Sequence, residues 1–249
     1  MKETWYNFSK KTVRIGFTAP KYRALSWSGM TKIIAFEGID GTGKTVQMER
    51  LAAFLRSHGK SVMELSFPVY DSFFGSLVGR YLTAKDGIAA NEVDGKSMAL
   101  WFALDRFEVF QSLDYSGYDF LLINRYVLSN AVYQSIRDCD LHKPDILDFV
   151  LTLEHDHFHL PKPDINLVLD MDIEEAAGNV DKKGFRDYVG NARDVYESID
   201  SIQARARKKY QEYAKRLASI VFVPCMKDGK LESIDTIADR IAAVVSPLL

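Results

Sequence analysis

The sequence predicts an α/β fold built on a five-stranded parallel sheet flanked by helices, and two observations support this prediction. From Thr31 onward, short apolar runs alternate with longer helical patterns. Each run is brief, partly β-branched and nearly continuous, which is typical of parallel strands buried on both faces. Such alternation implies right-handed crossovers, with ligands bound beyond the carboxyl ends of the strands. The predicted strands are Lys32–Phe36, Ser61–Phe67, Phe120–Ile123, Ile165–Leu169 and Ile220–Val223.

Helical stretches fill the intervals between these runs. Val46–His58 is amphipathic and is followed by Gly59, which suits the left-handed position just after a helix. A second helical pattern covers Met98–Phe110, and the charged stretch Arg205–Arg216 is typical of the solvated face of a helix. One large domain accounts for a chain of this length better than two small ones.

The bulk composition is that of an ordinary globular protein. Among 249 residues, 47% are hydrophobic and 27% are charged, and the formal net charge is −2. This balance gives no indication of a nucleic-acid partner, and no apolar run approaches the length of a membrane span. Cys139 and Cys225 form no metal-type spacing. Two isolated cysteines in a chain of this length favour a reduced, cytoplasmic protein.

The first 29 residues differ from the rest of the chain. They are basic, with scattered aromatic residues and no steady period, and Met30 stands directly before the first strong strand. We interpret residues 1–29 as an N-terminal extension outside the core fold, and residues 30–249 as the domain. A targeting or docking arm is the alternative, since a transit peptide would share the basic character.

A phosphate-binding loop follows the first predicted strand. Residues 38–45 match the pattern G-x-x-x-x-G-K-[ST], between a strand and an amphipathic helix as the motif requires. The glycines let successive backbone N–H groups point at phosphate oxygens, and the helix adds the positive end of its dipole. Lys44 brings a charge to the β- and γ-phosphates, and the Thr45 hydroxyl is placed for Mg²⁺. The sequence therefore predicts a P-loop NTPase fold. The predicted ATP-phosphate contacts are Gly38, Asp40, Gly41, Thr42, Gly43, Lys44 and Thr45.

Asp40 is unusual inside an anion-binding loop, because phosphate repels a carboxylate that has neither a donor nor a cation beside it. In one interpretation Asp40 accepts a sugar hydroxyl or helps to place Mg²⁺. In the other it is an ordinary Asp-Gly turn residue. The loop alone does not decide between them.

Residues 36–45, Phe-Glu-Gly-Ile-Asp-Gly-Thr-Gly-Lys-Thr, resemble the FEGxDGxGKT opening of the thymidylate kinases. Later segments resemble that family in the same order and at plausible spacing, from Thr31 to about Tyr213. None of them is specific alone, but together they are. They are Phe67-Pro68, Phe102-Ala103-Leu104-Asp105-Arg106, Arg125-Tyr126 with Ser129-Asn130-Ala131-Val132-Tyr133-Gln134, Leu160-Pro161-Lys162-Pro163-Asp164, and Asp194-Val195-Tyr196-Glu197 with Gln203.

This resemblance implies an enzyme that transfers the γ-phosphate of ATP to dTMP, giving dTDP for nucleotide biosynthesis. It also implies Mg²⁺ as the cofactor, small-molecule nucleotides as the partners, and a homodimer built on helices. The implied substrate contacts include Asp40, Phe67, Pro68, Arg125 and Tyr196.

Two residue pairs are the predicted base and sugar contacts. Phe102 and Arg106 lie four residues apart on one predicted helical face, so both can contact one ligand. A ring for stacking and a planar fork of donors for a carbonyl suit a pyrimidine, and the alternative is a core phenylalanine with a solvated arginine. The resemblance implies that Asn130 faces the thymine edge and that Tyr133 crowds the sugar 2′ position. A polar residue at a helix start and a half-buried aromatic are the alternatives for this second pair.

Catalysis of phosphoryl transfer depends on positioning and on neutralising charge. The resemblance implies that Arg125 holds phosphate, together with Lys44. Because position 41 is glycine, a further catalytic arginine must come from elsewhere, and the basic segment 181–193 is the predicted lid. We favour Arg193 and then Arg186 for this role, with an ordinary solvated loop as the alternative. A closing lid would also exclude water.

Two positions depart from the family pattern. Asn124 stands where the family usually carries an aspartate that helps to organise Mg²⁺, so it remains a candidate metal ligand without the charge. Val69 and Tyr70 occupy a segment that commonly holds an arginine for the dTMP phosphate. These departures keep open a kinase for another nucleoside or nucleotide, or a nucleotide-binding protein without catalysis. The intact Lys44-Thr45 pair argues against the non-catalytic alternative.

Residues 154–159, Glu-His-Asp-His-Phe-His, have the composition of a metal cluster. Alternate histidines in one short stretch rarely form a tetrahedral site without further ligands, and no partner motif is visible. We interpret this segment as a polar helix end and loop.

Overall fold

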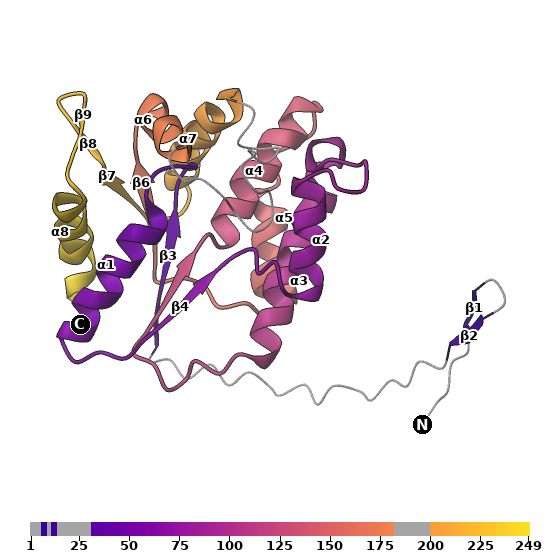
Figure 1. The fold of residues 1–249 in the computed structure, drawn as a ribbon, viewed down its shortest axis with the longest axis horizontal. Helices are drawn as coiled ribbons and strands as arrows, with labels where there is room; N and C mark the ends of the chain where they lie inside the picture. Colours follow the sequence, from indigo (N-terminus) through magenta and orange to yellow (C-terminus); the bar gives the residue numbers. More distant parts are fainter. Residues whose placement is uncertain (1–5, 9–10, 14–30, 182–199) are drawn as a thin grey trace.

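The fold is centred on a parallel sheet in a computed structural model that describes residues 6–8, 11–13, 31–181 and 200–249 (Figure 1). The five strands run in the order β4-β5-β3-β6-β7, and every neighbouring pair is parallel. This confirms the predicted sheet, with each strand end within one residue of its prediction. The strands are β3 (Lys32–Glu37), β4 (Val62–Ser66), β5 (Phe120–Asn124), β6 (Ile165–Asp170) and β7 (Ile220–Pro224).

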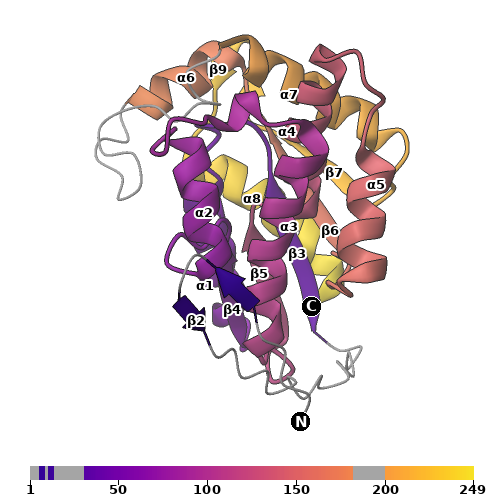
Figure 2. The ribbon, with the colours of Figure 1, turned by 90° about the vertical axis from the view of Figure 1, so that its right-hand side faces the viewer.

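Helices cover both faces of the sheet (Figures 1 and 2). On one face, α1 (Lys44–Ser57) packs against α8 (Ile234–Val245). On the other, α4 (Val127–Asp140) packs between α3 (Gly95–Ser112) and α7 (Asp200–Ala214). The remaining helical elements are α2 (Phe73–Leu82), η1 (Ala90–Glu92), α5 (Leu147–Leu151), the π-helical turn η2 (Thr152–His157), α6 (Ile173–Asp181) and η3 (Ser246–Leu248).

The core follows from the continuous apolar character of the central strands. Ile34, Ala35 and Phe36 of β3 and Leu122 and Ile123 of β5 are all fully buried. Strands buried on both faces have no solvent side, so they show no polar alternation. As predicted, α1 ends just before Gly59, which has φ +75°.

Two short hairpins lie outside the main sheet. β1 (Tyr6–Phe8) pairs antiparallel with β2 (Lys11–Val13), and β8 (Met226–Lys227) pairs with β9 (Lys230–Leu231). Within the described ranges, β1 and β2 are hydrogen-bonded to each other and to no strand of the five-stranded sheet. The domain boundary at residues 29 and 30 stays a prediction. No helix in the described part of the chain is long and apolar enough to cross a membrane.

The parallel strands bring separate segments to one edge of the sheet. The loop after β3 and the Phe67-Pro68 segment after β4 follow the carboxyl ends of their strands, and Asn124 ends β5 directly before Arg125. In an open α/β sheet this edge is where ligands bind. The fold therefore gathers most of the predicted site residues in one region.

Candidate active site

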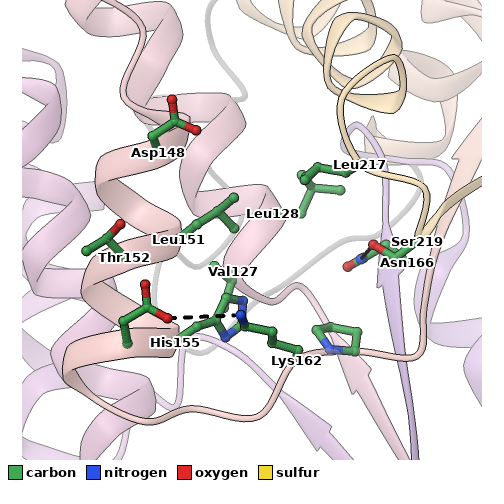
Figure 3. A pocket seen from close by; sticks show the side chains of 12 residues that line it. Val127, Leu128, Asp148, Leu151, Thr152, His155, Lys162, Asn166, Leu217 and Ser219 are labelled. Carbon is green, nitrogen blue, oxygen red and sulfur yellow. Dashed lines mark hydrogen bonds and ion pairs between the residues drawn. The ribbon is translucent and has the colours of Figure 1, made fainter.

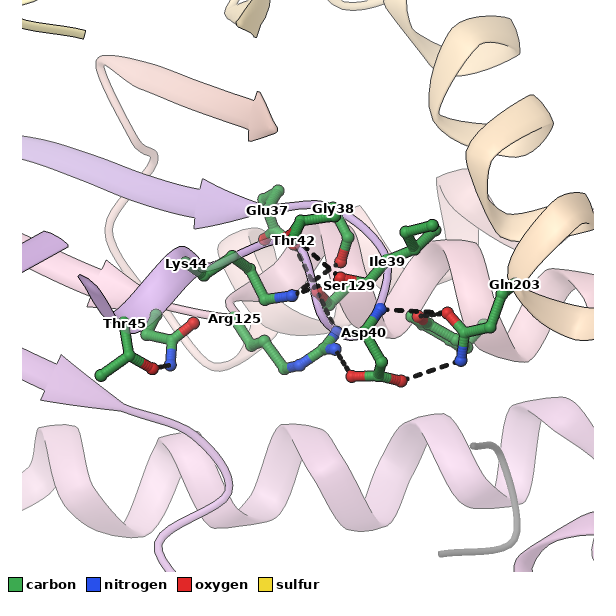
Figure 4. A network of polar contacts seen from close by, with 12 residues as sticks. Glu37, Gly38, Ile39, Asp40, Thr42, Lys44, Thr45, Arg125, Ser129 and Gln203 are labelled. Carbon is green, nitrogen blue, oxygen red and sulfur yellow. Dashed lines mark hydrogen bonds and ion pairs between the residues drawn. The ribbon is translucent and has the colours of Figure 1, made fainter. Parts of the chain in front are cut away.

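The loop between β3 and α1 has the backbone that its glycines predict. Gly38, Gly41 and Gly43 all have positive φ, at 125°, 82° and 80°. Lys44 opens α1, and its side chain lies back over the loop, with Nζ donating to the carbonyls of Gly38 at 3.1 Å and Ile39 at 2.7 Å (Figure 4). An ammonium group held on the inner side of the loop is placed to exchange these carbonyls for phosphate oxygens.

The loop is packed closely against the helix that follows β6. A Cβ atom added at Gly41 would lie 1.9 Å from the carbonyl oxygen of Ala176 in α6. The amide of Asn179 in the same helix donates to the carbonyl of Gly41 at 3.1 Å. Glycine is therefore required at position 41 both by the positive φ and by the neighbouring helix.

Asp40 is the centre of a polar network beside the loop (Figure 4). One carboxylate oxygen accepts from Arg125, and the other accepts from Nε2 of Gln203 at 2.9 Å. The carbonyl oxygen of the Gln203 side chain accepts from the backbone N–H of Asp40 at 3.1 Å and from the hydroxyl of Tyr133 at 3.0 Å. Asp40 thus meets a cation and a donor, as a carboxylate in this loop requires, and it is more than a turn residue.

Arg125 lies between this network and the ring of Tyr133. Its guanidinium carbon is 5.5 Å from the ring centroid of Tyr133. Burial lowers the pKa of Arg125, but Asp40 together with Tyr133, Tyr210 and Glu37 raises it more, and the net pKa is well above its usual range. The arginine is therefore a permanent cation at the edge of the loop.

The backbone of Arg125 is held in an unfavourable conformation by the end of β3. Its φ is +60°, in the left-handed region that non-glycine residues rarely adopt. The backbone N–H of Arg125 donates to the carbonyl of Phe36 at 2.9 Å, and that of Tyr126 donates to Oε1 of Glu37 at 3.0 Å. Glu37 is fully buried and also accepts from the hydroxyls of Ser129 and Tyr210. This buried carboxylate fixes the turn that directs Arg125 toward Asp40.

The sequence alone indicates no role for Glu37 or Gln203. Glu37 lies inside the motif that carries the family resemblance, and a carboxylate at the last position of a buried strand was an available signal. Gln203 lies in a family-like segment, but nothing local in the sequence predicts that it contacts Asp40 and Tyr133.

The two candidate Mg²⁺ ligands are adjacent. The amide nitrogen of Asn124 lies 3.5 Å from the hydroxyl of Thr45 at the start of α1. The amide oxygen of Asn124 is buried and has no hydrogen-bond partner among the described residues. Mg²⁺ is usually held by one or two protein oxygens together with substrate phosphates. The Thr45 hydroxyl faces the amide nitrogen of Asn124, so the Asn124 oxygen can face the same ion only if the amide turns over.

Arg106, Asn130 and Glu154 form a second polar group, which we call the inner polar cluster. Glu154 accepts from Nε and Nη2 of Arg106 at 2.5 and 2.6 Å, and from Nδ2 of Asn130 at 2.8 Å. The three residues are 2%, 3% and 0% exposed, in the order Arg106, Asn130 and Glu154. Arg106 is therefore not a solvated arginine. The sequence suggests a polar helix end at Glu154, but the structure buries this residue completely.

Phe67 and Phe102 border this cluster. The guanidinium carbon of Arg106 lies 6.0 Å from the ring centroid of Phe67, which is itself 4% exposed and stacked near Phe110. Phe102 is half-buried on α3 and packs against the core. Pro68 follows Phe67 through a cis peptide bond and is half-buried. The substrate contacts of Phe67, Phe102 and Pro68 therefore stay predictions.

Asp105 fixes the segment that departs from the family pattern. Its carboxylate accepts from the backbone N–H of Val69 at 3.1 Å and from the hydroxyl of Ser72 at 3.0 Å. Burial raises the pKa of Asp105 above its usual value. Val69 is therefore an apolar side chain on a backbone that Asp105 holds in place.

Three predicted residues, Arg186, Arg193 and Tyr196, lie outside the described residues, as does most of the predicted lid. A separate cavity of about 260 Å³ lies beside α4, α5 and the π-helical turn, and its lining includes Val127, Leu151 and His155 (Figure 3). No residue predicted for nucleotide binding lines it. This cavity is distinct from the site at the carboxyl edge.

A parallel sheet with this strand order, a phosphate loop after β3 and an arginine after β5 define a P-loop kinase of the nucleoside-monophosphate class. Residues 36–229 match the family model described as Thymidylate kinase. The chain is 35% identical over 185 residues to the thymidylate kinase of Mycobacterium tuberculosis, covering 73% of this chain and 85% of the relative. It is 32% identical over 182 residues to the probable thymidylate kinase of Methanococcus aeolicus, covering 73% and 78%.

A solved structure shows the same fold. The thymidylate kinase of Candida albicans superposes with a TM-score of 0.66 at 24% identity, covering 88% of this chain and 92% of that one. The chain belongs to the thymidylate kinase family, which confirms the resemblance noted in the sequence.

Proposed function

We propose that this protein transfers the γ-phosphoryl group of ATP to dTMP, giving ADP and dTDP. The observation that carries the proposal is the position of Arg125, which is held against Asp40 directly beside the phosphate loop. A donor loop and a fixed cation at one strand edge suit a reaction in which two phosphorylated nucleotides meet.

The proposed step needs positioning more than covalent chemistry. A phosphate oxygen of dTMP forms a bond to the γ-phosphorus, and the bond from that phosphorus to the β–γ bridging oxygen breaks. Lys44 neutralises the ATP phosphates, and Arg125 holds the acceptor phosphate in line with them. Asp40 orients Arg125 and offers its carboxylate to the sugar of the acceptor. These assignments remain proposals for each residue.

We also propose that Thr45 and Asn124 hold Mg²⁺ together with the nucleotide phosphates. The ion would supply positive charge between the β- and γ-phosphates. For the lid, Arg193 and then Arg186 remain the proposed arginines, and Tyr196 a proposed substrate contact.

A homodimer and a cytoplasmic location complete the proposal. Exposed apolar side chains lie on α2, on α3 and between them: Phe73 is 66% exposed, Ile88 53% and Leu100 41%. A second copy of the chain is the proposed partner for this surface. Light scattering tests it, because a mass near 28.3 kDa at micromolar concentration would contradict the dimer. The cytoplasmic proposal rests on two free cysteines, Cys139 and Cys225.

A coupled ADP-release assay with Mg²⁺–ATP tests the function. The acceptors are dTMP, dUMP, the ribonucleotide of thymine, CMP and the free nucleosides. We expect the highest kcat/KM with dTMP. Lys44→Ala should lower kcat by about 10²–10³-fold, since it removes a charge that the transition state needs.

Two other results would redirect the proposal. Higher turnover with another acceptor would support a kinase of altered specificity. Bound ATP without turnover on any acceptor would support a nucleotide-binding protein that does not catalyse. Lys44→Ala must melt at a temperature close to that of the wild type for its loss of activity to be assigned to chemistry.

A further inference from the structure

We propose that Glu154 is a positioning residue that determines which hydrogen-bonding edge of a pyrimidine the site accepts. This inference rests on the proposed function, because it takes the ligand to be a pyrimidine nucleoside monophosphate. Glu154 is 48 residues from Arg106 and 24 from Asn130 in the sequence, and the fold brings its carboxylate into contact with both.

The orientation of the Asn130 amide is determined by two acceptors. Its Nδ2 group donates to the backbone carbonyl of Ala99 at 3.0 Å and to Oε1 of Glu154 at 2.8 Å. A carbonyl and a carboxylate can only accept, so the nitrogen of the amide must face them. The amide oxygen is therefore turned the other way.

That oxygen lacks a partner. Asn130 is 3% exposed, and its Oδ1 is buried with no hydrogen-bond partner among the described residues. A buried acceptor left unpaired is costly, and a ligand that brings a donor removes the cost. The N3–H group of thymine or uracil is such a donor, whereas N3 of cytosine carries a lone pair and would repel the oxygen.

The same carboxylate limits what Arg106 can offer. Glu154 engages Nε and Nη2 of Arg106, which leaves Nη1 as the guanidinium group that makes no hydrogen bond within the described ranges. This remaining donor suits the O4 carbonyl of thymine. The exocyclic amino group of cytosine would instead place a second donor against Nη1. Through Asn130 and Arg106, Glu154 thus selects for the imide edge of the base.

The π-helical turn Thr152–His157 lies between the inner polar cluster and the neighbouring cavity. Glu154 lies in the core, while the next residue, His155, lines the cavity and contacts the Leu160 carbonyl at 2.9 Å. Glu154 itself does not line the cavity.

The test compares dTMP with 5-methyl-dCMP, which differ only at N3 and at the C4 substituent. We expect the wild type to favour dTMP by at least about 100-fold in kcat/KM, because the wrong edge leaves buried groups unpaired. In Glu154→Gln, the added amide donor competes with Arg106 and Asn130. The preference for dTMP over 5-methyl-dCMP should fall at least tenfold because the KM for the acceptor changes, while the KM for ATP stays the same. Asp145→Asn is the matched control, since that carboxylate bridges Lys209 and Tyr213 elsewhere.

A wild-type measurement with N3-methyl-dTMP keeps the test independent of how the variant folds. Calorimetric binding of this analogue should be weaker than that of dTMP by at least about tenfold, because the methyl group replaces the donor. Equal binding would overturn the inference, as would an unchanged preference in a folded, ATP-binding Glu154→Gln protein. Selective dTMP binding without turnover would instead sustain the inference and defeat the proposed kinase reaction.

Discussion

The phosphate loop and the inner polar cluster bind by different means. In the loop, Lys44 contacts carbonyls five and six residues away, and the recognition groups are backbone atoms shaped by glycines. In the inner polar cluster, side chains from α3, α4 and the π-helical turn meet across 24 and 48 residues of sequence. Phosphate is common to all nucleotides and can be bound by a local backbone shape. A particular base edge requires side chains that tertiary packing holds in place.

The largest expected effect concerns the backbone-built region. Gly41→Ala adds a Cβ atom at φ +82° and 1.9 Å from the Ala176 carbonyl. We expect it to lower the free energy of unfolding by about 2–5 kcal/mol, from left-handed strain and overpacking together. ATP binding should weaken more than acceptor binding. Thermal denaturation and calorimetry with each nucleotide measure the two effects.

Gly59→Ala is the matched control for this change. Gly59 has a similar φ of +75°, but a Cβ atom there meets nothing within 4 Å. Its cost should be limited to the left-handed strain, about 1–2 kcal/mol. Equal destabilisation by the two substitutions would show that the contact with α6 is unimportant.

A smaller effect is expected at Gln203, which links Asp40 of the phosphate loop to Tyr133 of α4. Gln203→Ala removes the side-chain oxygen that accepts from the backbone N–H of Asp40 and from the hydroxyl of Tyr133. We expect kcat/KM for the acceptor to fall by about tenfold, in line with the loss of one or two hydrogen bonds. The ATP KM should change much less.

Gln47→Ala controls for the loss of a buried glutamine. Gln47 is 3% exposed and donates to the Ile234 carbonyl at 3.0 Å, linking α1 to α8. It should cost stability without changing the acceptor KM. A rise in the acceptor KM with this variant would remove the special role assigned to Gln203.

The smallest effect is expected from Asn124→Asp. The substitution places a carboxylate beside the hydroxyl of Thr45. We expect the Mg²⁺ concentration for half-maximal activity to fall by about tenfold, because a charged oxygen attracts the ion more strongly. An unchanged Mg²⁺ requirement would argue against Asn124 as a ligand. A sharp rise in kcat would indicate a site that has drifted from the family pattern, and a fall would indicate a tuned variant.

The contrast between local and long-range contacts also explains which parts of the structure can be predicted from the sequence. The strands and the loop were predictable because apolar continuity and the G-x-x-x-x-G-K-[ST] spacing are local signals. Arg106 could be placed on a helical face, but its burial depended on Glu154, which lies 48 residues away in a stretch that resembles a polar helix end. The motif that contains Glu37 is visible in the sequence, but the three buried groups that donate to its carboxylate are not. Contacts set by packing between distant elements leave no periodic trace in one sequence.

The contact between Gly41 and α6 also constrains how this architecture can evolve. The Ala176 carbonyl occupies the space that any side chain at position 41 would need. A lineage can therefore acquire a larger residue there only after α6 has shifted outward, so the order of the two changes is fixed. Relatives with an arginine at this loop position should accordingly carry compensating substitutions in the helix.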